Sequence, residues 1–142
     1  MGAHEVAQKF TDAFNAHDEA GMRKLTTDNA VFEGPGDVKL EGVDSVTAYA
    51  MNWLNAFPEA RLTVHNEVVA GDWVAQEFSF EGDHQGPLMS PAGEIPPTQR
   101  HLKGRAVQIL RIEGDKVADT RLYFDQVQVM TQLGLMPEPA TA

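Results

Sequence analysis

The sequence predicts an α+β domain, in which helices from the first half of the chain pack on one face of a sheet formed mainly by the second half. Apolar residues recur at helical spacing up to residue 57 and at every second position from residue 61 onward. Turns such as Gly114-Asp115 join consecutive strands, which favours antiparallel pairing over β-α-β units. A length of 142 residues, 42% of them hydrophobic, matches one domain with its own core.

Three helices are expected in the first half of the chain. The first helix ends near residues 15–18. Its apolar residues at helical spacing are Val6, Phe10, Ala13 and Phe14. Asp18 is expected to cap a second helix of one or two turns. Asp44 or Ser45 is expected to cap the third, which Pro58 ends. The apolar face of this third helix consists of Val46, Tyr49, Trp53 and Phe57.

Strands are expected at residues 30–33, 61–68, 73–82, 105–112 and 117–125, and a last helix at 127–133. The even-numbered positions of the later strands are the more apolar set, so they are expected to face the helices. Residues 83–100 contain four prolines and are expected to form a long loop near the mouth of any pocket. Loops of this length in compact domains are usually functional or mobile.

The charge and composition exclude several classes of partner. With 21 acidic and 11 basic residues, the formal net charge is −10, which opposes binding to nucleic acid or to an anionic membrane. The absence of cysteine excludes disulfides and thiol nucleophiles. The N-terminus lacks the pattern of a signal peptide, so a cytoplasmic location is expected.

Two polar residues interrupt the apolar, helix-facing side of the last strands. Gln108 and Thr120 could orient a ligand, and the Gln108 amide would then polarise a ligand oxygen. Alternatively, the two side chains could form hydrogen bonds with each other or with the backbone. The aromatic interior likewise either packs only as core or surrounds a hydrophobic small molecule. The residues predicted to bind such a ligand are Phe10, Phe14, Phe32, Trp53, Phe78, Phe80, Thr120, Leu122 and Phe124.

His84 is a candidate acid or base, because histidine titrates near neutral pH, although it could equally lie in a surface turn. No pair of histidines has the HxxxH or HxH spacing of a metal site, so no metal is expected. No glycine-rich phosphate loop is present either. No cofactor is therefore expected.

Five stretches together resemble the SnoaL-like polyketide cyclases of the nuclear-transport-factor-two-like superfamily: residues 12–15, 82–87, 96–100, 110–117 and 132–134. The resemblance implies a cone-shaped α+β barrel, with three N-terminal helices packed on a strongly curved, mostly antiparallel sheet. It also implies a single domain over residues 1–142, with a core at about 5–135 and a tail at 136–142. Members of this family catalyse aldol cyclisation without metal or cofactor.

The resemblance places the family's catalytic carboxylate at Leu122 and its histidine at Gln108, so neither residue type is retained. The catalytic candidates that remain are His84, in a Gly-x-His-x-Gly stretch, Gln108 and Asp125. Asp125 could instead cap the last helix. The implied function is a cyclase-type enzyme of secondary metabolism that acts on an apolar polycyclic or aromatic carbonyl compound. The alternatives are a non-catalytic binding or assembly module, or a cofactor-independent hydroxylase-type relative.

A homodimer is expected through the outer face of the sheet. Val107, Ile109 and Tyr123 are more apolar than a solvated face requires. The charged residues expected to pair across the interface are Arg105, Arg111 and Arg121 with Glu77 and Glu81.

Overall fold

A computed structural model describes residues 1–136, and its element order confirms the predicted α+β class. The helices are α1 (Ala3–Asn15), α2 (Glu19–Lys24), α3 (Val43–Ala56) and α4 (Gln126–Gln132). The strands of the main sheet are β1 (Thr26–Gly34), β2 (Val38–Glu41), β3 (Arg61–Ala70), β4 (Trp73–Asp83), β7 (His101–Glu113) and β8 (Lys116–Phe124). A separate hairpin consists of β5 (Leu88–Ser90) and β6 (Gly93–Ile95).

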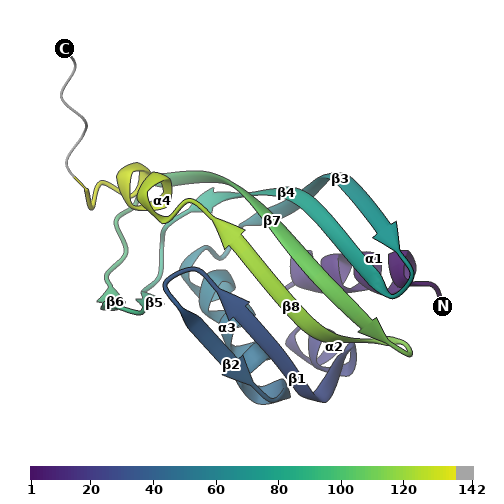
Figure 1. Cartoon of the computed structure of the whole chain (residues 1–142). Helices are drawn as coiled ribbons and strands as arrows, with labels where there is room; N and C mark the ends of the chain where they lie inside the picture. The colour runs from purple at the N-terminus through teal and green to yellow at the C-terminus, as the bar shows by residue number, and fades with distance from the viewer. Residues whose placement is uncertain (137–142) are drawn as a thin grey trace.

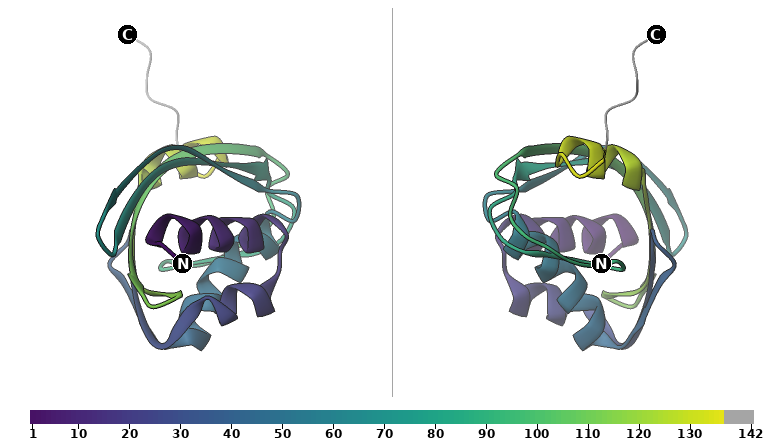
Figure 2. Two further views of the ribbon diagram at one scale, coloured as in Figure 1. Left: turned by 90° about the vertical axis from the view of Figure 1, so that its right-hand side faces the viewer. Right: turned by 90° about the vertical axis from the view of Figure 1, so that its left-hand side faces the viewer.

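The sheet is strongly curved and wraps around the N-terminal helices (Figures 1 and 2). Its strand order is β2-β1-β8-β7-β4-β3, and every pairing is antiparallel except that of β1 with β8. Irregularities between Val64 and Asn66 and between Arg111 and Ile112 bend the long strands, because an extra residue in one strand increases its twist. The concave face therefore encloses α1 and α3, and α4 lies at one end (Figure 1).

Three local predictions were wrong. The loop predicted at residues 83–100 contains the β5–β6 hairpin, and β2 follows the turn after β1. Segments of three or four residues are too short to show an alternating pattern, so the sequence did not reveal them. Helix α3 begins after Gly42, at a φ of 94°, and not at a capping side chain. Asp44 instead forms an ion pair with Arg23 of α2. Asp18 does cap α2, as predicted, by accepting a hydrogen bond from the Gly21 amide.

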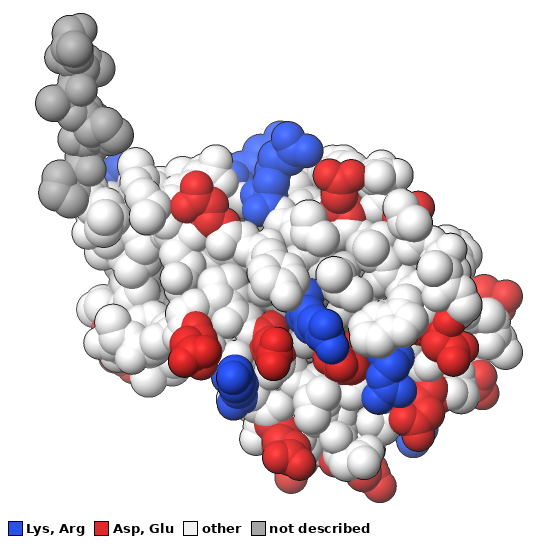
Figure 3. Space-filling model, in the orientation of Figure 1, with Lys and Arg blue, Asp and Glu red and all other residues white. Residues whose placement is uncertain are grey.

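The outer face of the sheet mixes charges of both signs with uncharged side chains (Figure 3). Tyr123 is 55% exposed and Val107 36% exposed on this face. The predicted pairing of arginines with Glu77 and Glu81 across a dimer interface stays a prediction, and within the described chain these carboxylates have other partners. Glu77 instead accepts from Asn66 and Glu81 pairs with His101, while the carboxylates beside Arg111 and Arg121 belong to Glu113 and Asp119.

Within residues 1–136, no helix is both long and apolar enough to cross a membrane. The predicted C-terminal tail lies almost entirely outside the described residues.

Candidate ligand cavity

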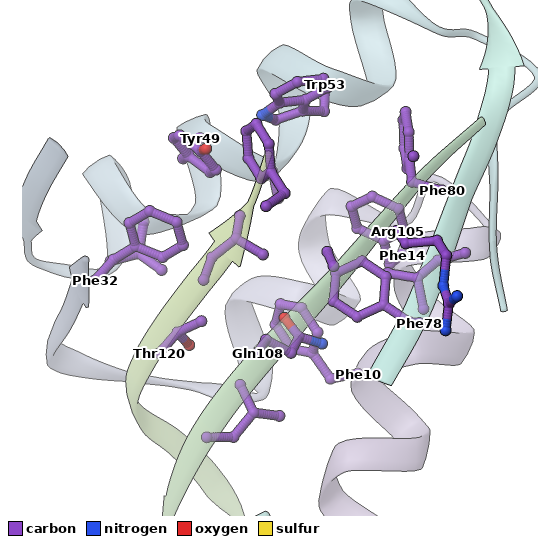
Figure 4. A pocket seen from close by; sticks show the side chains of 18 of the residues that line it. Phe10, Phe14, Phe32, Tyr49, Trp53, Phe78, Phe80, Arg105, Gln108 and Thr120 are labelled. Atoms are coloured by element: carbon purple, nitrogen blue, oxygen red, sulfur yellow. The ribbon is translucent and has the colours of Figure 1, made fainter. Parts of the chain in front are cut away.

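A cavity of about 120 Å³ lies between the concave face of the sheet and helices α1 and α3 (Figure 4). All of the residues predicted to bind a ligand line it: Phe10, Phe14, Phe32, Trp53, Phe78, Phe80, Thr120, Leu122 and Phe124. Their convergence follows from the strand register, because Gln76 and Phe78 of β4 lie opposite Gln108 and Ala106 of β7, and all four point inward. Their role in binding remains a prediction.

Edge-to-face aromatic contacts hold the wall of the cavity in place. The Trp53 ring lies 5.7 Å from the Phe80 ring and 5.6 Å from the Phe124 ring, nearly perpendicular to both. Phe14 approaches Phe80 at 6.2 Å in a similar geometry. Such pairs contribute about 0.5–1.5 kcal/mol each beyond the area they bury. The wall is therefore fixed before any ligand enters.

Gly104 forms part of the wall where β7 carries no side chain. It is buried, yet a Cβ added there would meet no atom within 4 Å. Its backbone also has no positive φ that would require glycine. The missing side chain therefore contributes directly to the empty space.

Few polar groups reach the cavity. Besides Gln108 and Thr120, its lining includes the Tyr49 phenol and Arg105, an exposed residue that was predicted to lie on the outer face, while no Asp, Glu or His of the described chain is part of it. Burial raises the pKa of Tyr49, so the phenol stays protonated at neutral pH. Sequence reasoning placed Tyr49 on the apolar face of the third helix but missed it as a site residue. Its spacing of four from Trp53 was the available signal.

Gln108 is held by a polar chain that crosses the concave face. Its Nε2 donates to Oε1 of Gln76 at 2.9 Å, and Nε2 of Gln76 donates to Oε2 of Glu67 at 2.8 Å. Gln76 is 1% exposed. Leu122, where the resemblance places the family's carboxylate, lies directly opposite Gln108 on the neighbouring strand.

His84 is fully buried but does not line the cavity. Its ring stacks on Phe57 at 5.1 Å, and Phe57 in turn contacts the cavity residue Phe80 at 5.4 Å. Nδ1 accepts from the Thr98 amide at 3.2 Å, and burial lowers the pKa of His84, so the neutral ring is favoured. The structure therefore does not support the prediction that His84 acts on a ligand in this cavity.

The loop around His84 instead closes the end of α3. The amides of Gln85 and Gly86 donate to the Ala56 carbonyl, at 2.9 and 3.0 Å, and so satisfy a group that the helix end leaves free. A Cβ at Gly86 would collide with the Asn55 carbonyl oxygen. The Gly-x-His-x-Gly stretch thus has a structural explanation.

Asp125 lies outside the cavity lining and is exposed. Its side chain accepts from the Gln128 amide at 3.1 Å and caps α4. The geometry of Asp125 therefore agrees with the alternative that it caps the last helix. Its position gives no support to the prediction that it is catalytic.

An outer pocket of about 350 Å³ adjoins the cavity beneath α4 and the β5–β6 hairpin. Four residues line both spaces: Tyr49, Trp53, Phe124 and Val129. Its other walls include Leu88 and Ile95 of the hairpin and Met130 of α4. The hairpin therefore stands at the mouth of the cavity, within the segment predicted to do so.

No cluster of three or more potential metal-ligating side chains occurs in the part of the chain that the structure covers. The expectation that neither metal nor cofactor takes part remains a prediction.

The family model for SnoaL-like polyketide cyclase matches residues 4–133. The chain belongs to the SnoaL-like polyketide cyclase family. A nogalonic acid methyl ester cyclase from Streptomyces nogalater is 33% identical over 89 residues, which cover 61% of this chain and 63% of that protein. The aligned region thus spans less than two thirds of this relative.

Two solved structures have the same fold. A protein described as a SnoaL-like polyketide cyclase, from Jannaschia sp. CCS1, superposes with a TM-score of 0.83 at 20% identity, over 95% of this chain and 93% of that chain. AclR from Streptomyces galilaeus, described as a hydroxylase, has a TM-score of 0.80 at 22% identity, over 95% and 97%. At these identities the likeness shows the fold alone. The cone-shaped α+β architecture implied by the resemblance is thereby confirmed.

Proposed function

We propose that this SnoaL-like chain binds an apolar polycyclic or aromatic compound of polyketide type in its central cavity. The proposal is supported by the family, by the ring-lined wall and by the name of the Streptomyces nogalater relative, a cyclase of nogalonic acid methyl ester. Mostly apolar walls with a few placed polar groups are typical of small-molecule sites.

The dimensions suggest how such a ligand would lie. An apolar cavity of about 150 Å³ accommodates one benzene ring, so the inner space of about 120 Å³ matches about one ring. The outer pocket is larger and shares four wall residues with the inner one. A polycyclic ligand would therefore place its terminal ring inside and the remaining rings beneath α4 and the hairpin.

We further propose that the chain holds this ligand without performing acid–base cyclisation. One observation carries this choice: the described lining contains no carboxylate or imidazole. Removal of a carbon-bound proton requires a base within hydrogen-bonding reach of that proton. The non-catalytic alternative from the sequence thus fits the site best.

The second candidate is a cyclase-type enzyme that needs neither metal nor cofactor. It is favoured by the curated relative and by the Tyr49 phenol, a donor that could stabilise a developing enolate oxygen. In that case the proton would have to leave to solvent, since no Asp, Glu or His of residues 1–136 lines the cavity.

Incubation with nogalonic acid methyl ester in deuterated water separates the two candidates. We expect saturable binding, with neither cyclisation nor carbon-bound deuterium incorporation above the rate without protein. Protein-dependent cyclisation would establish the second candidate and contradict the first. An absence of saturable binding to this ester and to simpler aromatic compounds would contradict the proposed ligand class.

A further inference from the structure

The polar chain that ends at Gln108 has a fixed direction. It begins at Glu67 of β3, whose side chain is only 16% exposed and whose other oxygen contacts His4 of α1. Glu67 lies opposite Gln76 in the register, and Gln76 lies opposite Gln108. The three side chains therefore form one row across the concave face.

The chemistry of the first member determines how both amides are turned. A carboxylate can only accept, so Gln76 must direct its NH₂ group toward Glu67. The oxygen of Gln76 then faces Gln108, which must in turn direct its own NH₂ group toward Gln76. Reversing either amide would bring two acceptors together in a site where Gln76 is too buried for water to replace the lost bond.

The Gln108 oxygen consequently points away from β4. Figure 4 shows this oxygen on the side of Thr120, with the nitrogen on the opposite side. No donor from residues 1–136 forms a hydrogen bond to this oxygen, although Gln108 lines the cavity. The cavity thus contains an oriented acceptor without a partner from the described chain.

We propose that Gln108 selects ligands that carry a hydroxyl donor, phenolic or enolic, and that Glu67 and Gln76 are positioning residues for this selection. The inference rests on the proposed binding function and specifies its ligand class. It reverses the expected role of Gln108, which was to polarise a ligand oxygen as a donor. A carbonyl compound would meet this acceptor best as its enol tautomer, because the keto form has no hydroxyl.

Three naphthalene derivatives test the selection: 2-naphthol, 2-methylnaphthalene and 2-acetylnaphthalene. They share one ring system but carry a donor, no polar group and an acceptor, respectively. We expect calorimetry to show 2-naphthol binding about tenfold more tightly than the other two, which corresponds to about 1.4 kcal/mol. In Gln108→Leu the three probes should bind with about equal affinity, because the oriented acceptor is gone.

Glu67→Lys supplies the sharper test, because lysine can only donate. It should turn both amides, direct the Gln108 NH₂ group into the cavity and shift the preference from 2-naphthol to 2-acetylnaphthalene. Glu77→Lys is the matched control: Glu77 also accepts from a side-chain amide, that of Asn66 at 2.8 Å, but on the outer face. If Glu67→Lys does not fold, Glu67→Gln should still reduce the preference to below about threefold, since glutamine imposes no direction.

The outcomes separate this inference from the function on which it rests. If 2-methylnaphthalene binds but all three probes bind equally, or if Glu67 variants leave the preference unchanged, the inference is contradicted and the binding function stands. If none of the probes binds saturably, the proposed binding function fails and the selection fails with it.

Discussion

Replacing Gly104 by alanine and then valine should progressively fill the cavity without disturbing the fold. An added Cβ at this buried position meets no atom within 4 Å. The cavity of about 120 Å³ approaches the size of an apolar cavity of about 150 Å³, which holds the six carbons of one benzene ring. One added carbon therefore occupies a small part of it, and the three carbons of valine occupy about half of it.

The magnitude follows from the apolar contact that a ligand would lose. At about 0.8 kcal/mol per methylene-sized group, alanine should cost about 0.8 kcal/mol of binding, or about fourfold, and valine about 2.4 kcal/mol, or about 60-fold. Stability should move in the opposite direction. Replacing glycine where the backbone needs no positive φ stabilises by about 0.4–1 kcal/mol, and valine should add to this by burying its methyl groups.

Titration of naphthalene by calorimetry and unfolding in urea measure the two effects separately. Ala70→Val, at an exposed position of β3, controls for adding a β-branched residue to a strand. Unchanged naphthalene affinity in Gly104→Val, or a loss of stability in Gly104→Ala, would refute the view that this glycine borders an open binding space.

Three further predictions concern His84, Leu122 and the outer face. Because burial lowers the folded pKa of His84, the unfolded chain takes up its proton first, and the contribution of His84 to stability should fall as the pH drops below about 6.5, by at most about 1.4 kcal/mol per pH unit, whereas His4 and His101, whose pKa values are raised by carboxylate partners, contribute in the opposite direction. His84→Gln should remove that component from urea unfolding measured between about pH 5 and 7.5, and an unaltered slope would argue against it. Leu122→Asp should destabilise the fold, because it buries a carboxyl group among aromatic rings. The same surroundings should raise the pKa of that carboxyl and allow it to act as a base. If the folded variant incorporates no carbon-bound deuterium into nogalonic acid methyl ester, the inferred position of the family's carboxylate is wrong. The chain should sediment as a homodimer at micromolar concentration and Tyr123→Lys as a monomer, since Tyr123 lies exposed beside Val107 on the outer face; a monomeric parent protein would exclude this interface.

The sequence was most informative where a local pattern reports the environment directly. The alternation in β7 and β8 separated inward from outward positions, so Gln108, Thr120 and Leu122 could be placed on one surface. The pattern could not show that Gln76 lies beside Gln108, because the two residues are 32 positions apart and their contact depends on the register of two strands.

His84 shows the complementary difficulty. The sequence offered it as a candidate acid or base, but its ring stacks on Phe57, in the segment after α3, and neither residue lines the cavity. The loop that contains His84 caps the end of α3 through hydrogen bonds from its backbone amides to the Ala56 carbonyl. No spacing of residues in the sequence predicts these hydrogen bonds. The sequence placed Tyr49 on the apolar face of its helix. Core residues and cavity residues have the same spacing on that face, so the spacing alone could not identify Tyr49 as a cavity residue.

The most direct test of the account locates the ligand itself. In the complex with 2-naphthol, nuclear Overhauser effects should connect the ring protons of the ligand to the methyl groups of Leu122 and to the Cα protons of Gly104, both on the cavity wall. Effects confined to Trp73 or Tyr123, which are exposed away from that wall, would contradict the central claim that the cavity is the binding site.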